Sequence, residues 1–516
     1  MISISPRGPA SLRNHTTEIE KLNEVRYDGL MKAIPKEVRE VVKDLERGGY
    51  EAFIVGGCVR DLLLGREPKD WDVATSGKPE EVQKLFPDSF YENRFFTVTV
   101  LKESRKKNLK EIEVTTYRSE SGYADYRRPD EVKAVKTIEE DLSRRDFAIN
   151  AMALRVKARG SEMIDPFGGQ ADVGNKIIRA VGKPKERFEE DALRMMRAVR
   201  LASELGFEIE SETRDAISIS SHLLEKISAE RIRDEFCRIL MSDLAMEGVE
   251  LLRELGLLRR FLPELEEGYG VGQNKHHVYT VWEHNLLALQ YACGQKWSLE
   301  VRLASLLHDV AKPRVKNGDG YNSTFYNHEV EGGKMAKTIL NRLKFSKKQV
   351  EKISKLVRFH LFYYNVDEVS ESSVRRLVRN VGAEDMDDLL RVRMADRIGS
   401  GVPKAEPYKL RHLKYLIEKV SQDPISVSRL KIRGERIMEL LKISPGPQVG
   451  QISDILLSEV VENPKSNTVS YLEQRIAELS QLSGKELSQT ALNARSQVGK
   501  LETKSDEMIK QKYWVS

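Results

Sequence analysis

The chain has 516 residues, of which 40% are hydrophobic and 32% charged, and its 85 basic and 80 acidic residues leave a formal net charge of +5. No stretch approaches the roughly 20 unbroken apolar residues that cross a bilayer, so we expect no membrane-spanning helix and no membrane partner. The 3 cysteines form no CxxC pair, which argues against a disulfide framework or a cysteine-based zinc site.

Length alone predicts about three or four domains, at roughly 100 to 200 residues each. The residues before 22 show no basic region followed by an apolar core, so we expect a protein of the reducing cytoplasm. The sequence leaves the oligomeric state open. Changes in composition and periodicity divide the chain into five segments, 1–47, 48–156, 157–268, 269–402 and 403–516.

The elements predicted first in the chain are helices, because apolar residues recur at helical spacing between residues 18 and 47. The stretch 51–57 (EAFIVGG) then predicts a buried strand that ends in a glycine turn, and 58–65 (CVRDLLLG) predicts a short helix. The polar stretch 119–137 predicts a mobile loop or an extended hairpin. Three further strands are predicted in DWDVAT (70–75), FFTVTVL (95–101) and EIEVTTY (111–117).

After residue 165 the pattern becomes helical and remains so. The stretch 268–277 (GYGVGQNKHH) interrupts it and predicts a boundary before a second helical block that carries most of the histidines. We expect His276 and His277 to be loop residues. Beyond residue 482 the chain is polar and poor in large apolar residues, which predicts a loosely held helix or disorder.

Two carboxylates of the mixed region, Asp70 and Asp72, flank Trp71 on a predicted strand, and a period of two places both on one face. Hard oxygen ligands in this arrangement suit Mg²⁺, which keeps coordination sites for substrate phosphates. Glu113 alternates with apolar neighbours and is predicted to bring a third carboxylate to the same ions. Two such ions, about 3.5–4 Å apart, would activate an attacking hydroxyl and hold a leaving pyrophosphate.

A glycine turn precedes these carboxylates. Gly56 and Gly57, between strand and helix, let backbone N–H groups approach a phosphate, and Arg60 lies one helical turn further on. Alone, a DxD is usually a solvated turn and a GG a tight connection. The fixed order of strand, glycine turn, arginine and paired carboxylates favours a nucleotide site. Cys58 is predicted to be a small packed residue rather than a reactive thiol.

The stretch FIVGGCVRDLLLGREPKDWDVAT (53–75) resembles the signature of the polymerase β superfamily of nucleotidyltransferases. More narrowly, it is similar to the class II group of CCA-adding enzymes and bacterial poly(A) polymerases. Further motifs agree in order: EVTTYR (113–118), RRDFAINAMA (144–153), DPFGG (165–169), EEDALRMMRAVR (189–200) and ERIRDEFCRIL (230–240). The resemblance implies an α+β fold with a polymerase β-like head, a long all-α neck, a further helical domain and a helical tail that grips tRNA.

A stripe of charged residues follows in the helical region, with Asp191, Arg194, Arg197 and Arg200 spaced three apart on one predicted helix. Read alone, this is an ordinary charged helix surface. The resemblance implies that Asp191 and Arg194 face the base of the incoming nucleotide. It also implies that Arg145 contacts that nucleotide, and we expect Arg197 and Arg200 to share in binding its triphosphate. Asp146 is predicted either to support the site or to touch substrate.

A second set of candidate metal ligands, histidines and aspartates, lies in the block 269–402. With these residues the block resembles the HD phosphohydrolase superfamily. Imidazoles and carboxylates together suit a divalent metal with room for water. The resemblance implies a metal site at His284, His308, Asp309, His328, His360 and Asp396. The alternative is a decayed domain retained as a helical spacer.

The sequence thus predicts a Mg²⁺-dependent enzyme that adds C, C and A to the 3′ end of tRNA from CTP and ATP without a nucleic acid template. Its alternatives are a poly(A) polymerase or a partial enzyme that adds CC or A alone. A metal-dependent phosphohydrolase acting on RNA ends or nucleotides is the alternative from another class. The stretch 119–137 is a candidate for the element that shifts specificity from C to A.

Overall fold

The computed structural model describes residues 30, 32–92, 96–121, 131–157, 161–274, 278–362, 364–366, 368–421 and 427–515. The helices predicted before residue 30 lie outside these residues, as do His276 and His277. The chain divides into two compact units, each described here by itself. Unit 1 comprises Met1–Arg358 and Ile398–Gly401, and unit 2 comprises Phe359–Arg397 and Val402–Ser516.

A seven-stranded sheet opens unit 1, in the order β3-β4-β5-β2-β1-β8-β9. β2 and β5 run parallel, and the other neighbouring strands run antiparallel. The small mixed sheet with helices confirms the predicted α+β class. The strands are β1 Ala52–Val55, β2 Asp72–Thr75, β3 Ser89–Glu92, β4 Thr97–Leu101, β5 Glu111–Thr116, β8 Ala153–Val156 and β9 Ser161–Ile164.

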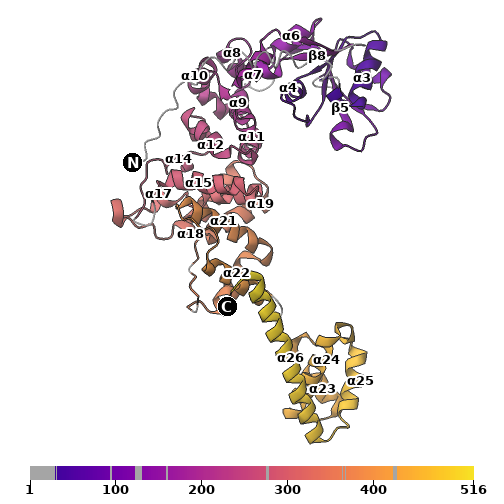
Figure 1. Ribbon diagram of the computed structural model, residues 1–516, viewed down its shortest axis with the longest axis vertical. Coiled ribbons are helices and arrows are strands. Elements are labelled where there is room, and N and C mark those ends of the chain that lie inside the picture. Colours follow the sequence, from indigo (N-terminus) through magenta and orange to yellow (C-terminus); the bar gives the residue numbers. More distant parts are fainter. Residues whose placement is uncertain are drawn as a thin grey trace. The chain divides into compact units, whose positions relative to one another are not determined.

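The strands of the sheet differ in how their residues are buried. β1 is buried at every position, whereas β5 alternates exposed and buried residues, as a strand with one covered face does. Helix α3 (Lys36–Arg47) buries one apolar face, which includes Val38, Val42 and Leu45, and it packs beside β1 (Figure 1). The predicted strands at 51–57, 70–75, 95–101 and 111–117 are all present, although β3, β8 and β9 were not predicted.

A separate hairpin lies in the polar stretch 119–137. Strand β6 (Arg118–Ser121) pairs antiparallel with β7 (Glu131–Ala134), which confirms the extended hairpin for the described residues. The tip, 122–130, lies outside them.

The rest of unit 1 is helical except for two short parallel strands, β10 (Ile177–Ile178) and β11 (Glu208–Ile209), which interrupt the predicted all-α neck. The helices after α3 are α4 Gly57–Leu63, α5 Pro79–Leu85, α6 Ile138–Ser143, α7 Gly169–Asn175, α8 Pro184–Glu190, α9 Leu193–Leu205, α10 Ser211–Ser220, α11 Ala229–Met241, α12 Ala245–Glu254, α13 Leu258–Phe261, α14 Pro263–Glu266, α15 Val281–Gly294, α16 Leu299–Leu307, α17 Lys312–Val315, α18 His328–Arg342 and α19 Lys347–Phe359.

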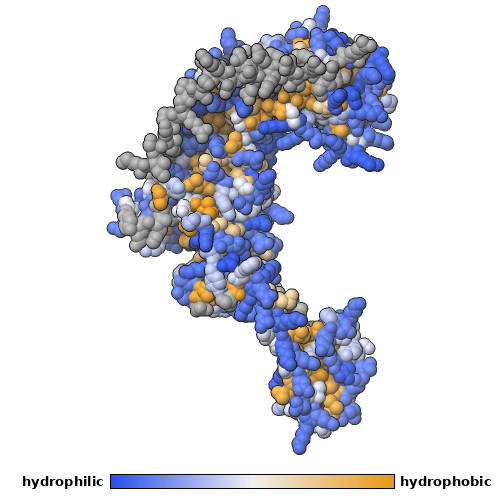
Figure 2. Space-filling model, viewed as in Figure 1, coloured by the Kyte–Doolittle hydropathy of each residue, from blue (hydrophilic) through white to orange (hydrophobic). Residues whose placement is uncertain are grey.

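Unit 2 is helical throughout its described residues. Its last helix, α26, packs along α24 and buries Leu487, Ala491 and Ala494 in a common apolar core, which excludes the predicted alternative of disorder beyond residue 482. Figure 2 shows hydrophobic residues gathered between these helices. No helix among the described residues is both long and apolar enough to cross a membrane. The helices are α20 Glu371–Val381, α21 Met386–Gly399, α22 Tyr408–Ser421, α23 Gly434–Leu441, α24 Pro447–Glu462, α25 Val469–Leu479 and α26 Gly484–Tyr513.

Candidate active site

The predicted carboxylates lie at the start of β2. Trp71 is buried and anchors the segment, Asp72 is the first strand residue, and the exposed Asp70 precedes the strand rather than lying on it. Asp72 pairs in register with Glu113 of the parallel strand β5. Neighbouring residues in register point to the same face, so the third predicted carboxylate lies beside the second.

The charges around Asp72 and Asp70 favour a bound cation. Burial raises the pKa of Asp72, the nearby Arg145 opposes the rise, and the like charge of Asp70 adds to it. Two carboxylates that repel one another and present hard oxygen atoms fit Mg²⁺, which would offset their charge.

The glycine turn is shaped by the neighbouring arginine. Gly56 has φ +83°, in the region that favours glycine, and a Cβ there would lie 2.9 Å from Nη1 of Arg145. Arg60, on α4, donates to Asn150 Oδ1 at 2.7 Å and is also paired with Asp61. The turn therefore leaves backbone and guanidinium groups close together, as a phosphate site requires.

A cavity of about 480 Å³ lies over these residues, within the size range of small-molecule sites. It brings together every residue predicted for this site except Glu113, whose place beside Asp72 comes from strand register. Its lining consists of Gly56, Gly57, Arg60, Asp70, Asp72, Arg118, Arg144, Arg145, Asp146, Asn150, Asp191, Arg194, Arg197 and Arg200.

One residue of the predicted charged stripe, Asp191, does not lie on the same helix as the others. Arg194, Arg197 and Arg200 lie on α9, but Asp191 precedes that helix. Its carboxylate accepts from the Leu193 backbone N–H at 3.1 Å and from Arg231 of α11 at 2.8 Å. Asp191 therefore accepts the first N–H of the helix from the position before its N-cap residue, Ala192, and it still lines the same cavity.

The three arginines of α9 are each held by protein oxygens. Arg194 is buried and makes three hydrogen bonds, to Glu190 and to the carbonyls of Arg187 and Arg144. A guanidinium has five N–H donors, so part of its donor capacity is not used by these bonds. Arg197 pairs with Asp146 at 2.8 Å.

Arg200 and Asp146, which line the cavity, are held in place by ion pairs. Arg200 pairs with Glu235 at 2.6 Å and with Glu204 at 2.8 Å. Burial alone would raise the pKa of Asp146, but Arg197 and Arg194, helped by hydrogen bonds, hold it below its ordinary value. Asp146 is therefore a buried anion that supports the cationic wall.

Sequence reasoning missed several residues of this site. Arg118, Arg144 and Asn150 line the cavity, and Arg231 holds Asp191. All four lie inside motifs quoted above, so their motif membership was the available signal. Asp141 was missed entirely, although it stands three and four residues before two arginines, the spacing at which helical ion pairs form.

Asp141 ties together the arginines of the RRD motif. Its buried carboxylate pairs with Arg144 at 2.7 Å and with Arg145 at 3.2 Å, and it accepts from the backbone N–H of Arg118. Burial alone would raise the pKa of Asp141, but the charges of Arg145 and Arg144 and the hydrogen bonds lower it. This carboxylate orients Arg145 toward the glycine turn.

Replacing Asp141 by Asn is expected to destabilise the sheet region by about 3 kcal/mol near neutral pH, because two partly buried guanidinium groups lose their counter-charge. A lowered folded-state pKa means that the contribution is present above the unfolded value of about 3.9 and is lost as pH falls below it. Hydrogen exchange of the β1 and β2 amides measures the difference, which should shrink toward pH 3. Asp215→Asn, an exposed carboxylate on α10, is the control and should change little.

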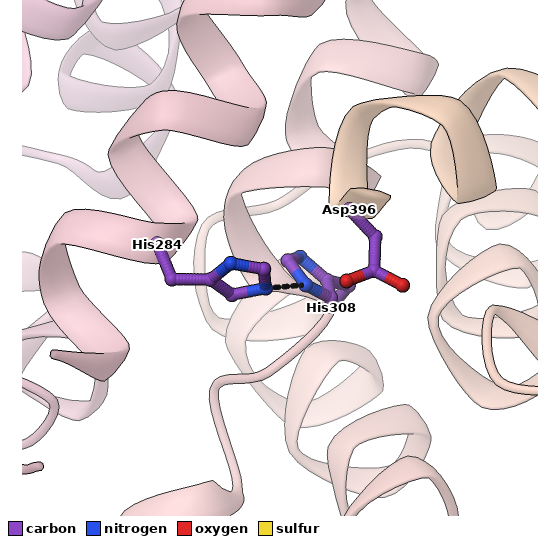
Figure 3. A group of neighbouring side chains, drawn as sticks. All are labelled: His284, His308 and Asp396. Carbon is purple, nitrogen blue, oxygen red and sulfur yellow. Dashed lines mark hydrogen bonds between the residues drawn. The ribbon is translucent and has the colours of Figure 1, made fainter. Parts of the chain in front are cut away.

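A second cluster lies in unit 1, where α15, the end of α16 and the start of α18 meet. Nε2 of His284 lies 2.8 Å from Nε2 of His308 (Figure 3). Asp309 Oδ2 lies 3.1 Å from the first of these nitrogens and 3.3 Å from the second. Its other oxygen lies 3.3 Å from Nε2 of His328. All four side chains are buried.

The outer nitrogens of two of these imidazoles are fixed by backbone carbonyls. Nδ1 of His308 lies 2.7 Å from the Ser305 oxygen, and Nδ1 of His328 lies 2.7 Å from the Phe325 oxygen. A carbonyl only accepts, so Nδ1–H is the donor in both rings, and Nε2 of each ring faces the cluster. Metal-binding histidines are oriented in this way, so the donor set fits a divalent metal.

His360 and Asp396, the remaining predicted ligands, are buried and belong to unit 2. Asp396 lies on α21 three residues before Gly399, where the chain is again part of unit 1. A Cβ at Gly399 would lie 2.8 Å from the His284 carbonyl oxygen. The metal-binding role of His360 and Asp396 stays a prediction.

Three family models match the chain. Residues 52–179 match the poly A polymerase head domain, 206–268 the probable RNA- and SrmB-binding site of polymerase A, and 281–398 the HD domain. The first of these matches spans the sheet that carries the carboxylates, the glycine turn and part of the basic cavity. The chain is thus similar, over separate stretches, to proteins that carry a poly A polymerase head domain and to proteins that carry an HD domain.

Its relatives include the CCA-adding enzyme of Geobacillus sp. (strain WCH70), 47% identical over 258 residues, which are 50% of this chain and 60% of that protein. The CCA-adding enzyme of Lactobacillus helveticus (strain DPC 4571) is 49% identical over 223 residues, 43% of this chain and 52% of that protein. The matches thus span between half and two thirds of these relatives.

Among solved structures, the Bacillus stearothermophilus CCA-adding enzyme in complex with CTP is 29% identical, with a TM-score of 0.58, and the match covers 87% of this chain and 98% of that one. A CCA-adding enzyme in complex with ATP is 20% identical, with a TM-score of 0.52, and covers 90% of this chain and 98% of its own. The second likeness concerns the fold alone.

Proposed function

We propose that the protein adds C, C and A to the 3′ end of tRNA from CTP and ATP without a nucleic acid template. The observation that carries the proposal is one cavity in which paired carboxylates and a glycine turn face Asp191 and the arginines of α9. The relatives are named CCA-adding enzymes, and one related structure holds CTP.

In the proposed reaction the 3′-hydroxyl of the RNA attacks the α-phosphorus of the bound nucleotide, and pyrophosphate leaves. Asp70 and Asp72, with Glu113 beside them, would hold Mg²⁺, which supplies charge stabilisation at the attacking and leaving oxygens. Arg60 and Arg145 bind the triphosphate close to the Gly56 turn. Catalysis then consists mainly of positioning and charge stabilisation.

The choice of base is assigned to Asp191 and Arg194. A carboxylate that accepts and a guanidinium that donates can match the hydrogen-bonding edge of cytosine or adenine. Since protein groups do the reading, no template strand is required. The hairpin β6–β7 is the proposed element that shifts the preference from C to A, and shortening it should impair the addition of A selectively. Equal and intact addition of both nucleotides would contradict this role.

The test uses purified protein, Mg²⁺ and tRNA transcripts that end before CCA, after C and after CC, each given CTP, ATP or both. Sizing of the products on a sequencing gel should show addition of CCA and then a halt. A lengthening ladder of A would identify a poly(A) polymerase. A stop at CC, or addition of A to CC ends alone, would identify a partial enzyme. No addition in any lane would contradict the proposal.

A second activity, hydrolysis of phosphate esters at RNA ends or in nucleotides, is favoured by the inward-facing Nε2 atoms of His284, His308 and His328 around Asp309. These residues, with His360 and Asp396, would hold a divalent metal that activates water. Purified protein should contain metal by mass spectrometry and hydrolyse 2′,3′-cyclic AMP. His308→Ala should lose both properties, whereas Asp72→Asn should retain the hydrolysis. Metal content and hydrolysis unchanged by His308→Ala would exclude this site.

A further inference from the structure

A separate cavity lies entirely within unit 2, between the segment after α19 and helices α21 and α22. Its volume is about 470 Å³, which lies in the usual range of small-molecule sites. Phe362, Leu410 and Leu413 form an apolar wall, and the two leucines are buried. A flat apolar group therefore has a surface on which to pack.

The charged residues of this cavity are all basic. Arg393, Arg397 and Lys409 line it, and no carboxylate does among the described residues. Two of these cations already have protein partners. Arg393 pairs with Asp396 at 2.5 Å, and Lys409 donates to Asn365 Oδ1.

Arg397 differs from the other two. Its Nε–H is buried, and within the described part of the chain it has no hydrogen-bond partner. No carboxylate of those residues is paired with its guanidinium. The partly buried Arg397 guanidinium therefore keeps hydrogen-bond donors that a bound anion would accept.

We propose that this cavity binds a nucleoside monophosphate, with the phosphate on Arg397 and the base against Phe362 and Leu410. Only Arg397, among the three cations of the cavity, has no side-chain partner within the described residues. A single guanidinium matches a monophosphate better than it matches a triphosphate. The Arg393 guanidinium lies 5.8 Å from the centroid of the Phe362 ring, so the aromatic side chain and the basic residues of the cavity adjoin one another. The ligand is either a free mononucleotide or the terminal nucleotide of an RNA.

The experiment is photolabelling of the full chain with 8-azido-AMP, followed by peptide mapping, which separates this cavity from the head. Label is expected in the peptides that contain residues 361–365 or 407–413. Arg397→Gln should reduce that label at least tenfold, and Arg397→Lys should restore part of it. Lys404→Gln, an exposed cation outside the cavity, is the matched control and should label as the parent does.

Competition then defines the ligand. Unlabelled AMP should compete at least tenfold better than adenosine or inorganic phosphate, because both halves of the cavity contribute. An RNA ending in a phosphate that competes better than AMP would place the ligand at an RNA end and still support the site. Label confined to head peptides, or unaffected by Arg397→Gln, would overturn the proposal. Because the readout is a mapped peptide, this result is independent of nucleotide addition.

Discussion

Replacing Asp72 by Asn is expected to lower the rate of nucleotide addition to RNA by at least about 10³-fold, equivalent to about 4 kcal/mol of activation free energy. The amide keeps the size of the side chain but loses the charge that holds Mg²⁺, whose stabilisation of the reacting oxygens amounts to several kcal/mol. Single-turnover rates with a tRNA transcript that ends before CCA measure the loss directly.

The same substitution should not unfold the protein. Asp72 is a partly buried carboxylate beside Asp70, and burying like charges costs stability. We therefore expect the melting temperature without Mg²⁺ to stay equal or rise. Asp88→Asn, an exposed carboxylate in the same sheet region, is the matched control and should keep the parent rate. A variant at Asp72 that retains a tenth of the parent rate would remove that residue from the catalytic centre.

The sheet could be predicted because its buried strands are short apolar runs bounded by glycine or polar turns. β1, β2, β4 and β5 have this pattern, whereas the register of Asp72 with Glu113 is seen only in the structure. β3 and β9 lack it: each is a short edge strand with little apolar alternation. Their pairing is decided by neighbours distant in sequence, which local periodicity does not encode.

The catalytic motifs were visible in the sequence, but the bonds that hold their side chains were not. The spacing of Arg194, Arg197 and Arg200 was sufficient to place them on one helix. The position of Asp191 depends on Arg231, 40 residues later, and on a hydrogen bond from the Leu193 N–H. Asp141 became important only when the fold brought Arg118 to it. The contacts made by Arg231 and Arg118 follow from tertiary packing and carry no local signal.

Replacing Asp191 by Ala is the second large expected effect, and it concerns the choice of base. Loss of the acceptor should reduce kcat/KM for both CTP and ATP by about 100-fold, equivalent to about 3 kcal/mol, since a buried polar contact to the base is left unmade. The ratio of CTP to UTP use should fall as well, because a pocket selects against a wrong base through the groups that it leaves unpaired.

The control must separate recognition of the base from the structural role of Asp191, since that carboxylate also accepts from the Leu193 N–H and pairs with Arg231. Arg231→Gln removes the ion pair and leaves the carboxylate in the cavity. If Asp191 reads the base, Arg231→Gln should lower both rates moderately and keep most of the CTP-to-UTP ratio. If Asp191 acts only through the ion pair, the two variants should lose rate and selectivity equally. Selectivity measured by competition between CTP and UTP on one transcript decides between them, because a loss of folded protein scales both products alike.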